Sequence, residues 1–372
     1  MKTINGYEFI QMFEEFSPKK HALEGDPIGL HVGTLNKKIK KVMIALDVMQ
    51  DVVDEAIEKD VDLIIAHHPL IYRPLKNIST EDPTGKLIEQ LIKHDIAVYA
   101  AHTNLDVSSG GVNDMLAVAL KLEDTTVLVP TYSETLKKLV VFVPEEDEEQ
   151  MLQALGHAGA GAIGEYTECS FSSIGTGRFL PGGNTNPHIG KRGKLEWVKE
   201  VKIETVYPEH IEKKVIAAML KAHPYEEPAY DLYSLDLQSE QLGLGRVGEL
   251  SEEMNLQAFA EYVKVALDSG GVRVIGDLNS RVKKVAILGG DGNKYISAAK
   301  FKGADAYVTG DIYYHTAHDA MNMGLNIVDP GHNVEKIMKK GLTNILQEMS
   351  EKRNYEVKIF ASEINTDPYI FL

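Results

Sequence analysis

Residues 41–68 read KVMIALDVMQDVVDEAIEKDVDLIIAHH, and residues 284–311 read KVAILGGDGNKYISAAKFKGADAYVTGD. The two stretches align without a gap at a constant offset of 243 residues (284 minus 41), so that Asp62 matches Asp305 and His68 falls opposite Asp311. Each copy contains an apolar run, a helical segment and a second apolar run, and a further helix and apolar run follow it. The repeat predicts two similar α/β lobes that carry polar residues at their strand ends.

Apolar segments alternate with amphipathic ones throughout both halves. In the first half, a helical segment at 51–59 separates two apolar runs, and another at 86–94 leads into the run IAVYAAH. Such alternation predicts a parallel or mixed sheet with helices on its faces. The expected fold class is therefore α/β, with two similar lobes forming one core.

The middle of the chain has a different pattern. From about residue 129 the segments read strand, helix, strand, strand, helix and strand, which is the β-α-β-β-α-β order of a ferredoxin-like motif. The second copy of the repeat resumes only after this module. We therefore expect a first lobe at 1–128, an inserted domain at 129–235 and a second lobe at 236–372, whose first helix should begin near Ser251.

Bulk composition limits the classes of function. The chain has 372 residues and a net charge of −16, which makes a nucleic-acid partner unlikely because phosphate neutralisation needs clustered Lys and Arg. Cys169 is the only cysteine, so intrachain disulfides and thiolate zinc sites are excluded. The N-terminus lacks the continuous apolar region of a secretory signal, and no apolar window is long enough to span a membrane. A cytoplasmic location is expected.

The sharpest local signal is His67-His68-Pro69, directly after the apolar run VDLIIA. The C-terminal end of a strand is where α/β folds place ligands, and two adjacent imidazoles are costly to bury unless something uses them. The alternative is a pair of strand-end histidines that only hydrogen-bond to the backbone. Neither interpretation is favoured by these residues alone.

Two further segments carry polar residues after apolar runs. In HTNLD, at 102–106, the candidates are His102 and Asp106, although a plain turn is the favoured interpretation of this segment alone. In DPGHNVE, at 329–335, His332 and Glu335 are three residues apart and can share a helix face, which suits a metal pair. Taken alone, this segment favours helix capping instead.

The combination favours a metal site more strongly than any segment alone. It brings three imidazoles and two carboxylates from three strand ends: His67, His68, Asp106, His332 and Glu335. This set suits one or two borderline divalent ions such as Zn²⁺, Mn²⁺ or Fe²⁺. Five ligands exceed the needs of one tetrahedral zinc, so two ions per chain are expected, with zinc first.

These motifs resemble a known family. HHP after a strand, a downstream NLD and a C-terminal DPGHNVE are similar to the GTP cyclohydrolase I type 2 homologues, also called Nif-three-like proteins, as are the segments at 26–30 and 243–248. The resemblance covers nearly the whole chain outside the insert. It implies a dinuclear metal centre at the five residues above, with Glu335 the least certain because the spacing of the glutamate varies in the family.

The insert resembles a module of the PII and CutA kind that some members of the family carry. This resemblance implies trimer contacts, and the family resemblance implies a ring-like homohexamer. The segment HPYEEP, at 223–228, looks like part of a CutA-type domain. A rigid turn flanked by prolines is the favoured interpretation of this segment, and a ligand pocket is the alternative.

Two functions remain open at this point. The first is a metal-dependent hydrolase, with GTP as a substrate implied only by the family's name, His102 as a possible proton carrier and the catalytic residues otherwise unassigned. The second is a metal-binding regulatory protein that senses a small molecule through the insert. Residues 289–292 (GGDG) favour a tight turn over a phosphate loop. His315 and His318, with Asp311, fit a role in supporting the site or contacting substrate as well as they fit a polar helix surface.

Overall fold

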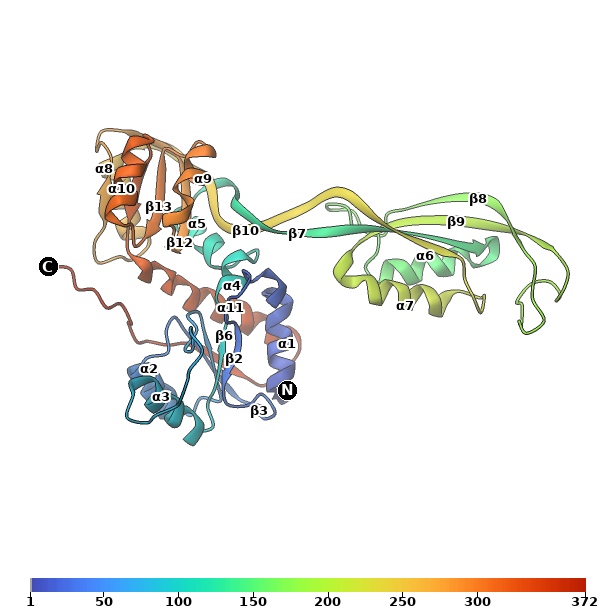
Figure 1. Cartoon of the computed structure of the whole chain (residues 1–372), viewed down its shortest axis with the longest axis horizontal. Coiled ribbons are helices and arrows are strands. Elements are labelled where there is room, and N and C mark those ends of the chain that lie inside the picture. Colours follow the sequence, from blue (N-terminus) through green and yellow to red (C-terminus); the bar gives the residue numbers. More distant parts are fainter. Residues whose placement is uncertain (1) are drawn as a thin grey trace. The chain divides into compact units, whose positions relative to one another are not determined.

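The computed structural model describes residues 2–372, apart from the side chains of residues 238–240. The chain forms two compact units, Met1–Tyr132 with Leu242–Leu372, and Ser133–Gln241, which we call the core and the insert. Strands β7 (Glu123–Pro144) and β10 (Tyr230–Asn255) lead out of the core and back into it (Figure 1). Each of these strands has residues in both units, so the compact insert begins and ends a few residues later than the expected range of 129–235.

The first lobe of the core contains a five-stranded sheet in the order β15-β4-β5-β6-β2. Its strands are β2 (Gly29–Val32), β4 (Lys41–Ala45), β5 (Leu63–Ala66), β6 (Ala97–Ala100) and β15 (Lys358–Ala361). Only β2 runs antiparallel to its neighbour. All residues of β5 and β6 are buried, as expected of parallel strands with both faces covered.

Helices cover the two faces of this sheet with different partners. On one face, α2 (Gln50–Glu58) and α3 (Pro83–Lys93) pack against side chains such as Met43 and Ile64. On the other face, α1 (Gly6–Phe16), α5 (Val112–Ala119) and α11 (Ile337–Lys352) pack against Ile44 and Ile65. Neighbouring strand residues thus point to opposite faces, which follows from the two-residue period of a strand.

The second lobe has the same plan. Its strands lie in the order β11-β14-β13-β12-β10. The strands not yet given are β11 (Arg273–Ile275), β12 (Arg281–Asp291), β13 (Ala306–Gly310) and β14 (Asn326–Asp329). The central three are parallel, and the flanking two are antiparallel to their neighbours. Helix α8 (Leu256–Ala266) packs on one face, and α9 (Ile296–Phe301) and α10 (Tyr314–Asn322) pack on the other.

The two copies of the repeat also match in hydrogen bonding. In the first lobe, Asp62 Oδ2 accepts from the backbone N–H groups of Lys40 (2.7 Å) and Lys41 (2.9 Å) at the start of β4. In the second lobe, Asp305 Oδ2 accepts from Lys283 (3.0 Å) and Lys284 (2.8 Å) at the equivalent place in β12. The expected mixed α/β core with several sheets is confirmed.

One hydrophobic core runs through both lobes. It includes Ile44 and Ile65 from the first sheet and Ile287 and Val308 from the second, together with residues of α5 and α11. A buried ion pair adds a polar link, since the Arg246 guanidinium bonds both carboxylate oxygens of Asp114 on α5. The lobes therefore form a single packed unit.

The insert has the expected order of elements. In chain order these are β7, α6 (Glu148–His157), β8 (Ser170–Phe179), β9 (Glu196–Pro208), α7 (Glu212–Ala222) and β10. The strands lie in the order β10-β7-β9-β8, and both helices lie on the same face of the sheet (Figure 1). Residues of β7, β9, α6 and α7 form a separate hydrophobic core, which makes the insert a packed domain of its own.

One expected boundary is wrong. The helix expected from about Ser251 begins at Leu256, because residues up to Asn255 continue β10. The Asn255 side chain caps α8 by accepting from the Ala258 N–H at 2.8 Å, so the capping-box pattern at 251–253 is not used. Within the described residues, no helix combines the length and the apolar content that crossing a lipid bilayer requires.

Candidate metal centre

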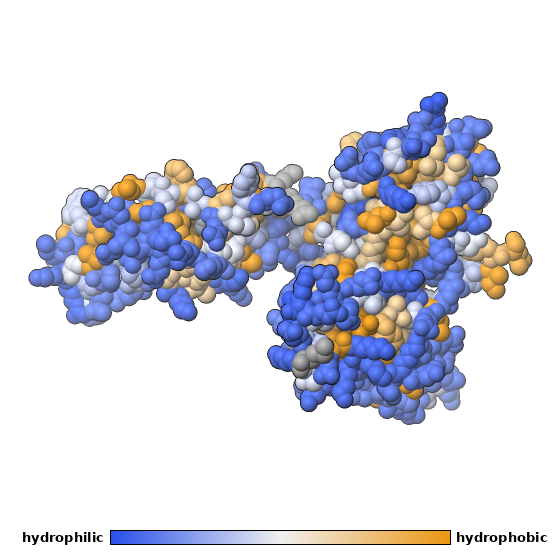
Figure 2. All heavy atoms as spheres, turned by 180° about the vertical axis from the view of Figure 1, so that it is seen from behind, coloured by the Kyte–Doolittle hydropathy of each residue, from blue (hydrophilic) through white to orange (hydrophobic). Residues whose placement is uncertain are grey.

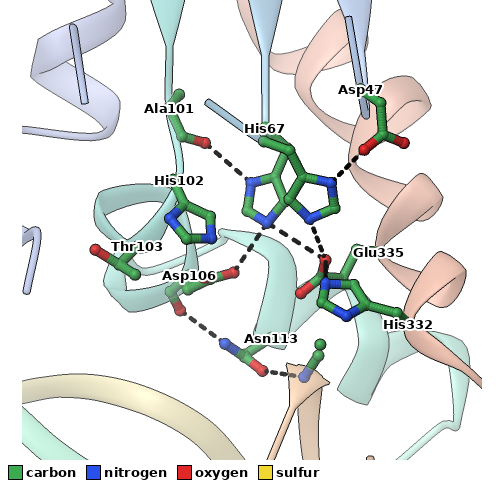
Figure 3. A network of polar contacts seen from close by, with 12 residues as sticks. Asp47, His67, Ala101, His102, Thr103, Asp106, Asn113, His332 and Glu335 are labelled. Carbon is green, nitrogen blue, oxygen red and sulfur yellow. Dashed lines mark hydrogen bonds and ion pairs between the residues drawn. The ribbon is translucent and has the colours of Figure 1, made fainter. Parts of the chain in front are cut away.

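Three strand ends of the core bring polar side chains together. His67 and His68 follow β5, and Asp106 lies on the short helix α4 (Thr103–Val107) that follows β6. His332 and Glu335 lie on η5 (His332–Lys336), the 3-10 helix that follows β14. Figure 3 shows the side chains of His67, Asp106, His332 and Glu335 converging on one space. This is the crevice beyond the carboxyl ends of parallel strands, where α/β folds place ligands.

Glu335 lies nearest the middle of the cluster. Its Oε2 is 3.0 Å from His68 Nε2, 3.1 Å from His332 Nε2 and 3.7 Å from His67 Nε2. The second carboxylate, Asp106, also approaches His67: its Oδ1 is 3.6 Å from His67 Nε2. All five residues expected from the sequence therefore lie together, although His67 and His332 are far apart in the chain.

Each imidazole of the set is held through Nδ1. His67 Nδ1 donates to the Ala101 carbonyl oxygen at 2.9 Å. His68 Nδ1 donates to Asp47 Oδ1 at 2.6 Å, and His332 Nδ1 donates to Asp311 Oδ2 at 2.7 Å. A carbonyl or carboxylate oxygen only accepts, so Nδ1 carries the proton and Nε2 faces the cluster. This outer support is the arrangement that orients metal-binding histidines.

The charges of the cluster are strongly coupled. Burial lowers the pKa of His68, but its hydrogen bonds to Asp47 and Glu335 outweigh burial and raise that pKa to about 10. Burial likewise lowers the pKa of His332, yet Glu335 and Asp311 raise it to about 9. Without a metal ion, these two imidazoles are therefore protonated at neutral pH and carry positive charge next to Glu335.

The two carboxylates respond in opposite directions. Burial raises the pKa of Asp106, and the nearby charge of Glu335 adds to the increase. Burial also acts to raise the pKa of Glu335, but three surrounding imidazoles hold it well below the usual range. The imidazoles thus favour the ionised form of Glu335, whereas burial and the charge of Glu335 disfavour the ionised form of Asp106.

Two buried atoms indicate what the cluster fits. His67 Nε2 and Asp106 Oδ1 have no hydrogen-bond partner within the described part of the chain, and the two residues are 0% and 8% exposed. Leaving a buried polar atom unpaired costs about 1–3 kcal/mol. A lone pair on nitrogen and a carboxylate oxygen aimed at the same space are the donors that borderline divalent ions prefer. The residues present therefore suit a divalent metal ion.

His102 adds a fourth imidazole, which the expected ligand set leaves out. Its Nδ1 donates to Asp26 Oδ1 at 2.8 Å, and its ring lies beside those of His67 and His68. One ligand atom from each of His67, His68 and His102 lies within 4.8 Å of the others, which makes a possible metal-holding group. Asp26 belongs to the early segment at 26–30, so that segment supports the site from outside.

The remaining sequence candidates have structural roles. His223 Nε2 donates to the Phe142 carbonyl oxygen at 2.9 Å, and its Nδ1 accepts from the Tyr225 N–H at 3.0 Å, which is consistent with a rigid turn. Gly290 lies against the cluster, where an added Cβ would be 2.7 Å from Glu335 Oε1. His315 and His318 lie on α10 and share ring contacts with Tyr314.

A pocket of about 470 Å³ opens beside the cluster. Five of the polar residues described above line it: His68, His102, Asp106, His332 and Glu335. Its other walls come from both lobes and are largely apolar. A small molecule in this pocket would therefore lie against the cluster.

These features define a class of protein: a two-lobed α/β core with a cluster of histidines and carboxylates, competent to hold metal ions, at the strand ends between the lobes. The chain belongs to the Duf34/NIF3 (NGG1p interacting factor 3) family, whose model matches residues 4–368. The resemblance to Nif-three-like proteins is thereby confirmed.

Named relatives and solved structures agree with this family. The chain is 62% identical over 371 residues to a Bacillus subtilis (strain 168) protein called GTP cyclohydrolase 1 type 2 homolog, and the alignment covers 100% of both chains. A crystal structure of a Bacillus cereus protein related to NIF3 is similar at 58% identity with a TM-score of 0.96, covering 100% of both chains. A Staphylococcus aureus protein of known structure is similar at 32% identity with a TM-score of 0.81, again over 100% of both chains.

Proposed function

We propose that the cluster binds two divalent metal ions through His67, His68, Asp106, His332 and Glu335, and that the protein is a metal-dependent hydrolase. The single observation that carries this proposal is the buried convergence of five donors, with His67 Nε2 and Asp106 Oδ1 unpaired. Zinc is the first candidate, with iron or manganese next, because imidazole and carboxylate donors suit all three.

The residues divide into two roles. Glu335 lies within reach of three imidazoles, so it is the residue best placed to be shared between ions. Asp47, Asp311 and the Ala101 carbonyl hold the imidazoles in one tautomer. A pair of such ions, when bound, lowers the pKa of a water molecule and supplies hydroxide near neutral pH.

His102 is the best-placed group to carry a proton. Asp26 fixes its Nδ1, so that Nε2 faces the pocket, and no described residue hydrogen-bonds that nitrogen. A histidine held by a carboxylate in this way accepts a proton at Nε2 and returns it to a leaving group. We expect His102→Gln to retain bound metal and to lose most turnover.

Metal content tests the first half of the proposal. We expect protein purified without added metal, and then supplied with zinc, to hold about two ions per chain by elemental analysis. Asp106→Asn and Glu335→Gln should each lower this number, whereas Asp51→Asn, an exposed residue of α2, should not. Wild-type protein that binds no divalent ion at millimolar supply would refute the proposal.

Turnover tests the second half. The names of the relatives make GTP the first substrate to try, with formate as the product to be measured, followed by an unbiased set of metabolites. Hydrolysis that depends on metal and is lost in Asp106→Asn supports the hydrolase. Absence of turnover on GTP alone removes the cyclohydrolase activity and leaves other hydrolytic reactions to the wider set.

A regulatory protein is the second candidate function. The element order and the strand order of the insert support a PII-like module, and a separate pocket of about 280 Å³ lies within it beside Phe179 and Tyr225. If the protein is regulatory, the metal ions would stabilise the core and the protein would not convert any substrate. The two functions are separated by whether metal occupancy changes a reaction rate or only the thermal unfolding temperature.

A homohexamer is part of the proposal. Large hydrophobic side chains are exposed on the core, among them Val118, Val265 and Phe301. Figure 2 shows hydrophobic residues (orange) on one face between the two lobes and again at the C-terminal end. Exposed apolar surface of this kind marks sites of association. Sedimentation velocity of the full chain should give a species of six subunits.

A further inference from the structure

The walls of the pocket beside the cluster indicate which part of a substrate is recognised there. We propose that the pocket binds an uncharged planar ring compound, such as a nucleobase or nucleoside, and that it does not recognise a phosphate chain. This inference rests on the proposed hydrolase function, because it assumes that the pocket beside the metal centre holds the substrate.

The apolar side of the pocket is rigid. Leu244 of β10 and Leu288 of β12 line it, are almost fully buried and belong to the hydrophobic core of the second lobe. Leu23, Tyr72 and Tyr295 complete this side. Pockets lined by aliphatic and aromatic side chains with a few polar groups suit flat, weakly polar ligands.

In the metal-loaded protein, where the ligand imidazoles are neutral, the charged side chains of the pocket are all acidic. Among the residues that line it, three are carboxylates (Asp106, Asp291 and Glu335) and none is Lys or Arg. Burial acts to raise the pKa of Asp291, but hydrogen bonds from Asn293 and Tyr313 lower it, so this carboxylate is ionised. Two divalent ions and three carboxylates would leave a net charge of only about +1. A triphosphate carries several negative charges, which exceed this excess, and no Lys or Arg among the lining residues balances the remainder.

The two arginines closest in sequence to the lining residues do not change this charge balance. Arg246, two residues after Leu244, is buried and directs its donors to Asp114 and to the carbonyl oxygens of Gly243 and Gly245. Arg73, next to Tyr72, is exposed and does not line the pocket. Neither guanidinium therefore presents a donor to a phosphate group in this pocket.

The hydrogen-bonding groups that remain free match a neutral ring. The hydroxyls of Tyr72 and Tyr295 have no partner among the described residues, and burial raises the pKa of Tyr295, which keeps its hydroxyl protonated. A phenol can donate to a ring nitrogen or carbonyl oxygen and accept from a ring N–H. His102 Nε2, free on the same pocket, adds a third such group.

Binding measurements on the full-length, zinc-loaded protein test this inference. Guanosine and GTP are titrated calorimetrically, each with excess Mg²⁺ so that free triphosphate does not extract the bound ions, at about 50 and 200 mM salt. We expect guanosine to bind at least as tightly as GTP, with little dependence on salt. Tyr295→Ala should weaken guanosine binding at least tenfold, whereas Tyr166→Ala, an exposed tyrosine of the insert, should not.

Three outcomes would overturn the inference. They are GTP binding at least tenfold tighter than guanosine, a loss of GTP affinity in Arg73→Ala, and no binding of guanosine at millimolar concentration. None of these decides whether the protein is a hydrolase, which is judged by metal content and turnover. Conversely, guanosine binding, together with no turnover of any compound in the wider set, would count against the hydrolase and leave the recognition of a neutral ring supported.

Discussion

Glu335 connects the two lobes at the cluster through its contacts with His67 and His68. Its side chain comes from η5 in the second lobe and reaches His67 and His68 at the end of β5 in the first. Three imidazoles around one carboxylate lower its pKa, and the carboxylate raises theirs in return. In the absence of metal, protons on the imidazoles balance the charge that metal ions would otherwise balance.

The stability of the metal-free protein should therefore fall as pH rises. The folded-state pKa values of His68 (about 10) and His332 (about 9) lie above the ordinary value of about 6.5. Their contribution to stability is complete below about pH 6.5 and is lost as pH rises through about 9 to 10. Calorimetry should show an unfolding temperature that falls between pH 7 and 10 after chelation and stays level with zinc bound. An equal decrease in both forms would contradict this assignment.

Gly290 is required because backbone and cluster approach closely. Its φ is +67°, and a Cβ there would lie 2.7 Å from Glu335 Oε1 and 3.2 Å from His332 Nε2. We expect Gly290→Ala to weaken zinc binding at least tenfold in a competition assay with a chelating dye. Gly164→Ala is the matched control, since Gly164 has a φ of +57° and open space around it. The control shares the backbone strain of about 1 kcal/mol but should bind zinc normally; equal effects would show that strain alone is responsible.

The C-terminal segment after β15 contacts both lobes of the core. Ser362 donates to Glu55 of α2 at 2.5 Å, and Lys339 of α11 donates to the Ile364 carbonyl oxygen at 2.9 Å. Further along, Phe371 packs against Gly270 and Gly271 in the second lobe, where no larger residue would fit without displacing the ring. The segment therefore contributes to holding the two sides of the cluster together.

Thr366 connects this segment to the cluster. Its hydroxyl donates to Asp47 Oδ2, and Asp47 Oδ1 holds His68 Nδ1. Thr366→Val keeps the shape and removes the donor, so we expect zinc affinity to fall about tenfold, with a small change in unfolding temperature. Thr80→Val, at an exposed position, is the control. Unchanged affinity in Thr366→Val would show that Asp47 holds His68 without help from the segment.

Over the whole molecule, the cluster belongs to one unit alone. Every residue of the proposed metal centre lies in the core, and the insert has its own hydrophobic core. The chain leaves and re-enters the core through β7 and β10, which are neighbours in the sheet. A short linker between Tyr132 and Leu242 should therefore be able to replace residues 133–241.

Deletion of the insert should leave metal binding intact. We expect the shortened chain to hold as many zinc ions as the full chain, because none of the ligands is removed. The same deletion with Asp106→Asn should lose zinc and serves as the control. A shortened chain that is folded by circular dichroism yet binds no zinc would show that the insert supports the centre.

Much of the site could be predicted from the sequence because strand ends are marked locally. A buried run followed closely by polar residues identifies His67, His68 and His332 as lying just beyond strand ends, in the first and the second lobe respectively. The outer partners could not be predicted, since Asp47, Asp26 and Thr366 lie 21 to 319 residues from the groups that they hold. Similarly, HTNLD reads as a turn, but packing of its buried residues makes it the helix α4.

By itself, the sequence determined the alternating α/β elements, the repeated lobe, the inserted module and the five donors, because periodicity and strand-end polarity are local properties of the chain. Only the tertiary structure decided that Glu335 meets three imidazoles, that each imidazole presents Nε2, and that the adjoining pocket has carboxylates and apolar walls. Those features depend on distances between side chains far apart in the chain, and only the packing of the two lobes around α5 and α11 sets such distances.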